Sequence, residues 1–246
     1  YGEVLPNPSF EVFPLKEVAD LGKPLGIPLI VDNTAAPVIC KPFDHGASVL
    51  LHSTTKYIGG HGNSIGGILV DSGNFEWEKF PERQPKLNTP DPSYAGAVWT
   101  EAVKPLGPIA YILKARVTLL RDMGAAMSPF NAFMFLTGME TLPLRMREHS
   151  KNAVKVADFL KSHKKVEKVI YPTEVAVERA KKYLSGGNGG LMGFEIAGGR
   201  DAGKKFINSL ELLYHVANIG DSKSLAIHPA STTHSQLSED ELSDAG

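Results

Sequence analysis

The chain has 246 residues, 42% hydrophobic and 22% charged, which is the composition of a globular protein with a sizeable core. Its 26 basic and 27 acidic residues give a formal net charge of -1, so no excess charge favours nucleic acid or an anionic membrane as a partner. No apolar run approaches the roughly 20 residues of a membrane span, and the first residues lack the pattern of a signal peptide, so we expect a cytoplasmic protein. The single cysteine, Cys40, is expected in the core.

Three short apolar segments in the first third of the chain have the pattern of buried strands, at 26–32, 48–53 and 67–71. The first ends at Asp32, the second leads into Thr54-Thr55-Lys56, and the third ends at Asp71. Strands of a parallel sheet present their carboxyl-terminal residues at the ligand crevice. We therefore expect the polar ends of these three segments to contribute to one site.

The remaining segments predict a second, smaller unit. Residues 80–93 are rich in proline and charge and predict a surface loop, whereas helical patterns dominate from 109 to about 163, the longest at 131–163. Strand-like runs at 166–171, 191–196 and 210–216 then alternate with helical or loop segments. These patterns predict an α/β fold with a mostly parallel sheet in a large domain over 1–135, and an α+β domain over 136–246.

The functional groups of four residues near the strand ends together suggest a binding site for one cofactor. These residues are Asp32, Ser53, Thr55 and Lys56. A partly desolvated lysine has a lowered amine pKa and can act as a nucleophile and a base. A carboxylate beside a pyridine nitrogen keeps that nitrogen protonated, and hydroxyls donate hydrogen bonds to phosphate. Amine, carboxylate and hydroxyls match the aldehyde, ring nitrogen and phosphate of pyridoxal 5′-phosphate (PLP).

The sequence around these residues is Val31-Asp32-Asn33-Thr34, followed by His52-Ser53-Thr54-Thr55-Lys56-Tyr57-Ile58-Gly59-Gly60-His61-Gly62. Both strings resemble the family of Cys/Met-metabolism PLP-dependent enzymes, which includes cystathionine γ-synthase, cystathionine and methionine γ-lyases, and O-acetylhomoserine sulfhydrylase. The resemblance implies the type I, aspartate aminotransferase-like transferase fold. It also implies that Lys56 carries PLP as a Schiff base, that Asp32 pairs with the ring nitrogen, that Ser53 and Thr55 bind the phosphate, and that Asn7 donates to the phenolic oxygen.

Two strings near the end of the chain resemble the sulfhydrylase branch of that family. They are Asn-Ile-Gly-Asp-Ser-Lys-Ser-Leu at 218–225 and Ile-His-Pro-Ala-Ser-Thr-Thr-His at 227–234. This resemblance implies that Asn218 helps to bind the substrate carboxylate, and that sulfide replaces the acetoxy group of O-acetylhomoserine in methionine and cysteine biosynthesis. A homotetramer built from two dimers is implied, with a sulfur-carrier protein as one source of sulfide. Family members are longer than this chain, so further site residues are expected outside it at both ends.

The sequence is also compatible with other functions. Cystathionine γ-synthase and γ-lyase activities use the same cofactor with another nucleophile or none. Gly62-Asn63-Ser64-Ile65-Gly66 matches the G-x-S-x-G pattern of serine hydrolases, although strand-like residues follow it where a helix is required. A catalytically silent protein with a PLP-enzyme fold is another alternative. The eight histidines and one cysteine show no metal-binding spacing, so we expect no metal.

Overall fold

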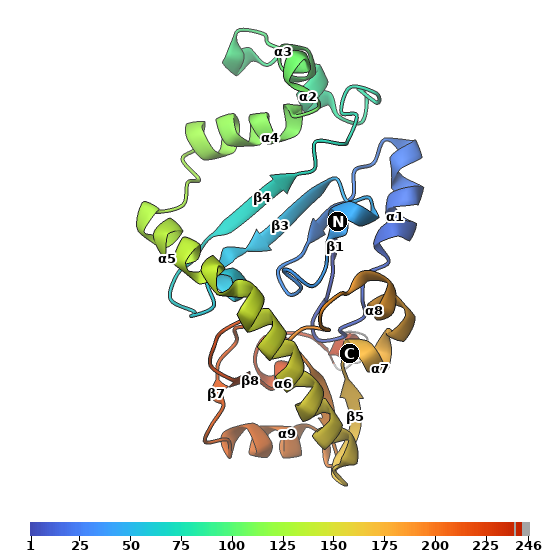
Figure 1. The fold of residues 1–246 in the computed structure, drawn as a ribbon, viewed down its shortest axis with the longest axis vertical. Helices are drawn as coiled ribbons and strands as arrows, with labels where there is room; N and C mark the ends of the chain where they lie inside the picture. The colour runs from blue at the N-terminus through green and yellow to red at the C-terminus, as the bar shows by residue number, and fades with distance from the viewer. Residues whose placement is uncertain (239, 243–246) are drawn as a thin grey trace.

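A four-stranded sheet forms the centre of the computed structural model, which describes residues 1–238 and 240–242 (Figure 1). Its strands are β1 (Gly2–Glu3), β2 (Ile30–Asp32), β3 (Val49–Ser53) and β4 (Gly67–Asp71), neighbouring one another in that order. Strands β1, β2 and β3 run parallel, and β4 runs antiparallel to β3. The mostly parallel sheet predicted from the three apolar segments is therefore confirmed.

The direction of β4 shows that one expectation about the site was wrong. Ser53 pairs with Gly67 and Val49 pairs with Asp71, so Asp71 lies at the opposite end of the sheet from Ser53. Asp32 pairs with Leu51 and lies at the Ser53 end. Side chains alternate along a strand with a period of two residues in either direction. The apolar pattern of 67–71 consequently held no information on the direction of the strand.

Short helices pack around two tryptophans on one side of the sheet. Helices α2 (Pro85–Asn88), α3 (Trp99–Ala102) and α4 (Ala110–Lys114) contribute to a cluster that includes Trp77, Trp99 and the fully buried Val49 of β3. The predicted surface loop at 80–93 thus contains the single turn α2, whose Leu87 is buried. Asp91 accepts hydrogen bonds from the Trp99 indole N–H at 2.8 Å and the Lys114 ammonium at 2.5 Å, which fixes this region to α4.

The long helical pattern at 131–163 corresponds to two helices. Helix α5 (Pro129–Glu140) ends before Thr141, and α6 (Leu142–Ser162) begins after it. Pro143 is the second residue of α6, where a proline is tolerated because the first N–H groups of a helix have no acceptor within it. The two helices run from the sheet into the part of the molecule formed by the C-terminal residues (Figure 1).

The C-terminal part has the mixed helix and strand character that was predicted. Strands β5 (Val166–Ile170) and β6 (Gly193–Ile196) pair antiparallel, and they are accompanied by α7 (Pro172–Val175), α8 (Val177–Tyr183) and α9 (Gly199–Asn208). The predicted strand at 210–216 is reduced to β7 (Tyr214–His215), which pairs with β8 (Leu225–Ala226). The division of the chain after residue 135 stays a prediction, and this position lies inside α5.

The main core extends across that division. It contains Val4 directly after β1, Val31 of β2, Tyr57 from the turn after β3, and Met146 and Tyr183 from the C-terminal part. Cys40 belongs to the same core, as predicted, and its burial raises the pKa of the thiol to about 12. Within the described ranges, no helix combines the length and apolar character that crossing a membrane requires.

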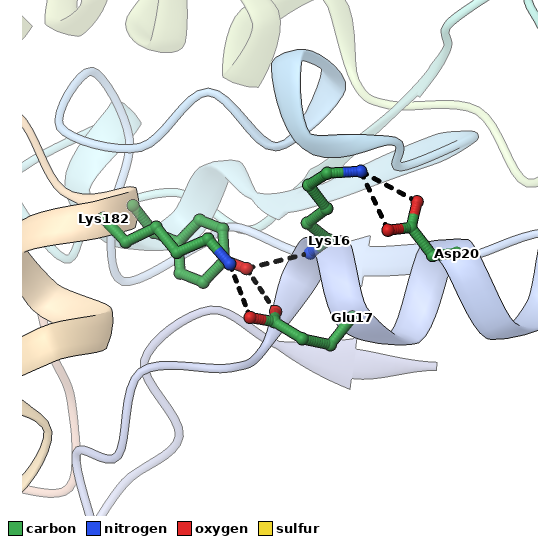
Figure 2. A network of polar contacts seen from close by, with 5 residues as sticks. Lys16, Glu17, Asp20 and Lys182 are labelled. Atoms are coloured by element: carbon green, nitrogen blue, oxygen red, sulfur yellow. Dashed lines mark hydrogen bonds and ion pairs between the residues drawn. The ribbon is translucent and has the colours of Figure 1, made fainter.

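A polar network on the surface also joins the two parts (Figure 2). Lys182 of α8 donates to Glu17 of α1 (Leu15–Gly22) at 2.5 Å, and the Tyr183 hydroxyl donates to the other oxygen of the same carboxylate. The backbone N–H of Lys16 donates to the Tyr183 hydroxyl at 3.1 Å. These contacts, with that of Lys182 first, lower the pKa of Glu17 to about 2.

Candidate active site

Lys56 lies in a short turn, η3 (Thr54–Ile58), that directly follows β3 and whose backbone is non-helical at Lys56 itself, with φ −92° and ψ −124°. The turn closes through hydrogen bonds from Gly59 N–H to the Thr54 carbonyl at 2.9 Å and from Gly60 N–H to the Lys56 carbonyl at 2.8 Å. The chain then leaves the turn at Gly60, whose φ of +74° is a conformation that glycine adopts without steric cost. The lysine is therefore presented at the carboxyl-terminal end of the parallel strands.

The Lys56 amine is partly buried and contacts a residue from the far end of the chain. Its Nζ donates to Asn218 Oδ1 at 2.6 Å. No carboxylate lies within ion-pair distance of this amine among the described residues, and burial lowers the pKa of Lys56. Lower solvation favours the neutral amine, which is the form that acts as a nucleophile or a base. This is the environment that the sequence predicted for Lys56.

Asp32 lies at the end of β2, beside the strand that leads to the lysine. Its Oδ1 accepts the Thr34 N–H at 2.8 Å, and Thr34 Oγ1 accepts the Ser53 N–H at 2.7 Å. Asp32 Oδ2 is 3.3 Å from the Tyr1 hydroxyl, which donates to it. These bonds tie the ends of β2 and β3 together and hold the carboxylate in one orientation.

Two other ionisable groups respond to the negative charge of Asp32. Burial raises the pKa of Glu3, which pairs with Asp32 across β1 and β2, and the Asp32 charge raises it further. Burial lowers the pKa of His52, and the Asp32 charge acts in the opposite direction. The carboxyl-terminal ends of β1 and β2 thus carry acidic side chains, and a negative charge there stabilises a cationic ring nitrogen.

The remaining candidate residues differ in their hydrogen bonds and exposure. Ser53 ends β3, and its hydroxyl has no hydrogen-bond partner in the part of the chain that the structure describes. The Thr55 hydroxyl accepts the Gly66 N–H at 3.1 Å and donates to the Gly66 carbonyl at 3.3 Å, so it closes the following loop. Asn7 is exposed and follows β1 at the same end of the sheet as Asp32. The cofactor-binding roles of these residues stay predictions.

The groups gathered at this end of the sheet fit PLP. The Lys56 amine is partly buried, the Asp32 carboxylate is fixed at the end of the strand next to β3, and the Ser53 hydroxyl is available as a donor. They match the aldehyde, ring nitrogen and phosphate of the cofactor. Asn218, which was expected to bind the substrate carboxylate, is brought to the same place by its contact with Lys56.

Three residues around the lysine turn were not singled out from the sequence. Tyr57 is 1% exposed, and its ring meets His149 edge-on with centroids 5.5 Å apart. Arg145 donates to the carbonyls of Tyr57 and Ile58. Arg145 and His149 belong to α6 and lie about 90 residues from the turn in sequence. Their helical spacing alone does not distinguish them from ordinary residues of an amphipathic helix.

The serine hydrolase alternative is wrong on geometric grounds. The residue after the loop at 62–66 begins β4, whereas a nucleophile elbow requires a helix there. Ser64 is 7% exposed, and its hydroxyl oxygen lies 3.0 Å from the acceptor Asn63 Oδ1 and 3.4 Å from Met134 Sδ. A side chain held in this way is a packed loop residue.

Comparison with known proteins gives a consistent result over the full chain. A family model described as Cys/Met metabolism PLP-dependent enzyme matches residues 1–246. An O-acetyl-L-homoserine sulfhydrylase of Leptospira meyeri is 50% identical over 256 residues, covering 100% of this chain and 58% of that protein. A homocysteine synthase of Schizosaccharomyces pombe is 44% identical over 251 residues, again covering 100% and 58%.

Solved structures share the fold. A crystal structure from Campylobacter jejuni, described as an O-acetylhomoserine (thiol)-lyase with N'-pyridoxyl-lysine-5'-monophosphate, superposes with a TM-score of 0.92 at 40% identity, over 99% of this chain and 58% of that one. A cystathionine gamma synthase from Xanthomonas oryzae gives a TM-score of 0.76 at 30% identity, over 99% and 55%. The chain therefore spans little more than half the length of the proteins it matches.

Proposed function

Because the chain belongs to the Cys/Met metabolism PLP-dependent enzyme family, we propose that the whole protein is an O-acetylhomoserine sulfhydrylase. It replaces the acetoxy group of O-acetylhomoserine with sulfide and releases homocysteine and acetate. Identity of 50% to a sulfhydrylase and 44% to a homocysteine synthase supports this activity over γ-synthase action, for which the matched structure is 30% identical. The observation that carries the proposal is the partly buried Lys56 amine held on Asn218.

Each candidate residue binds a different group of the cofactor. Lys56 holds its aldehyde carbon, Asp32 its ring nitrogen, Ser53 and Thr55 its phosphate, and Asn7 its phenolic oxygen. When bound, PLP supplies a cationic ring that accepts electron density from the substrate carbon beside the amino group. The fixed charge of Asp32 keeps the ring nitrogen protonated, because an opposite charge at close range favours the ionised form.

Lys56 is the base that transfers protons of the substrate. Burial lowers the pKa of its amine and so favours the neutral, basic form, which takes a proton first at the substrate Cα and then at Cβ so that the γ-acetoxy group can leave. Asn218 orients this amine through its Oδ1, and its amide N–H groups are directed away from the lysine. Those N–H groups are available to bind the substrate carboxylate.

We further expect a cytoplasmic homotetramer built from two dimers, with free sulfide or a sulfur-carrier protein as the donor. The family resemblance supports both expectations.

The reaction is tested with the complete protein loaded with PLP. O-Acetylhomoserine is offered with sulfide, with cysteine, or alone, and products are identified by mass spectrometry. We expect homocysteine and acetate with sulfide as the fastest reaction. Cystathionine formed faster from cysteine would indicate a γ-synthase, and a 2-oxo acid with ammonia in the absence of a nucleophile would indicate a γ-lyase. Cofactor binding without any turnover would show a silent protein.

A further inference from the structure

Two helical segments end against each other beside the lysine. The turn η3 ends with the carbonyls of Tyr57 and Ile58, and α5 ends with the carbonyl of Gly138 among its last four. Carbonyl groups in the last turn of a helix lack a partner within it and carry a partial negative charge. Such an arrangement requires a donor from elsewhere in the chain.

Arg145 of α6 supplies that donor to all three carbonyls. Its Nη1 donates to the Tyr57 carbonyl at 2.6 Å, and its Nη2 donates to the carbonyls of Gly138 at 2.7 Å and Ile58 at 3.2 Å. Its Nε donates to Thr141 Oγ1 at 3.2 Å. The planar fork of a guanidinium suits several acceptors at fixed angles, which a lysine ammonium does not reproduce.

Three of the four hydrogen bonds that the Arg145 guanidinium donates go to backbone carbonyls. Within the described ranges no carboxylate forms an ion pair with Arg145, and its half-buried position lowers its pKa. Its charge-assisted hydrogen bonds to three backbone carbonyls fix the backbone segments that it binds. The bonds of Arg145 therefore define where the lysine turn sits.

Two glycines allow this close approach. A Cβ at Gly60 would lie 2.5 Å from Arg145 Nη1, and a Cβ at Gly138 would lie 2.5 Å from the Gly59 carbonyl oxygen. A side chain at Gly138 would separate the turn from α5, and one at Gly60 would displace the Arg145 guanidinium. The turn also contacts the segment that carries Asn218, since the Ser222 N–H donates to the Gly60 carbonyl at 2.8 Å. The backbone around Lys56 is thus held by both α5–α6 and the C-terminal segment.

We propose that Arg145 is a positioning residue, which clamps the turn η3 against the end of α5 and so keeps the Lys56 amine on Asn218. This inference rests on the proposed function, because it assigns Arg145 a role in placing the lysine that holds the cofactor. Loss of the clamp removes two hydrogen bonds to the turn and one to α5. The lysine then binds the cofactor in a less defined orientation, and a displacement of about 1 Å lowers turnover by on the order of 100-fold.

The test uses the complete holoenzyme with Arg145→Gln, Arg145→Lys and the control Arg147→Gln. Arg147 is exposed on the same helix. We expect Arg145→Gln to lower kcat by on the order of 10- to 100-fold while the KM for O-acetylhomoserine stays within about twofold. The visible absorbance of bound cofactor should persist, and its visible circular dichroism, which reports a fixed orientation, should weaken. Arg145→Lys should recover part of both losses, and Arg147→Gln should match the wild type.

The outcomes separate this inference from the proposed function. A colourless wild-type protein would contradict the proposed function itself. A coloured, active wild type with Arg145→Gln equal to Arg147→Gln in kcat and circular dichroism would overturn only the role of Arg145. If the Gln variant does not fold, the Lys variant decides, because its single ammonium cannot bridge three carbonyls. Wild-type values of kcat and circular dichroism in Arg145→Lys would then overturn the proposal.

Discussion

Hydrogen bonds fix the position of the Asp32 carboxylate at the end of β2. One carboxylate oxygen is held by the Thr34 N–H, and Thr34 in turn binds the backbone of Ser53. The charge therefore has a fixed position relative to the strand that leads to Lys56. Preorganised charge of this kind needs no rearrangement when a reaction develops charge beside it.

Replacement of Asp32 by Ala should lower kcat by at least on the order of 10²- to 10³-fold, because the ring nitrogen loses the charge that keeps it protonated. Steady-state kinetics with O-acetylhomoserine and sulfide measure this loss. Asp44→Ala, which removes an exposed carboxylate on the same part of the chain, is the matched control. Turnover near the wild-type rate in Asp32→Ala would contradict the role of this carboxylate.

Individual residues of the candidate site could be predicted from local patterns only where the functional residue directly follows or ends an apolar segment. Asp32 and Lys56 end neighbouring apolar segments, so a local pattern found both. Asn218 was found through resemblance, and its contact with Lys56 spans 162 positions. Arg145 gives no such signal, because its acceptors are backbone carbonyls that any residue could provide.

At the scale of secondary structure elements, α1 and α8 are joined by an exposed carboxylate. Contacts with Lys182 and then Tyr183 lower the pKa of Glu17 from 4.5 to about 2. A carboxyl pKa that is lower in the folded than in the unfolded state stabilises the fold above about pH 4.5, and this contribution is lost as the pH falls toward 2. The exposure of the pair and salt screening keep the contribution small.

Glu17→Gln should therefore lower the Tm at pH 7 by on the order of 1 to 2 °C relative to the exposed control Glu82→Gln. The difference should shrink as the pH is lowered through 4.5 and as salt is added. Thermal unfolding followed by circular dichroism across this pH range measures it. A difference independent of pH would show that the charge of Glu17 is not what joins α1 to α8.

The elements themselves were predicted more reliably than their directions and ends. The segments at 48–53 and 67–71 form β3 and β4 almost as expected, but pairing with β3 decides the antiparallel direction of β4. The helix expected at 131–163 divides at Thr141, before Pro143, and the Gly138 carbonyl of α5 accepts from Arg145. The direction of β4 depends on pairing with another strand, which local propensity does not encode.

At the scale of the whole molecule, one core connects the sheet to the C-terminal part. Met146 is fully buried in it with Tyr57, Ile58 and Phe135, which pack around the lysine turn. Met146→Ala should lower the free energy of unfolding by about 2–5 kcal/mol through lost burial and a residual cavity. Urea unfolding of the complete protein measures this, with the exposed Lys155→Ala expected within about 0.5 kcal/mol of the wild type. Equal stabilities of the two variants would refute this picture of the core.

We propose that Lys56 holds the cofactor at the end of the sheet, near the charge of Asp32. The visible absorbance spectrum of the complete protein with PLP, recorded for the wild type and for Lys56→Ala after gel filtration, tests this role of the lysine. We predict a visible band that co-elutes with the wild-type protein, disappears on addition of hydroxylamine, and is missing from the folded Lys56→Ala variant. A Lys56→Ala protein that kept the band, or a folded wild type that stayed colourless with added cofactor, would contradict the claim.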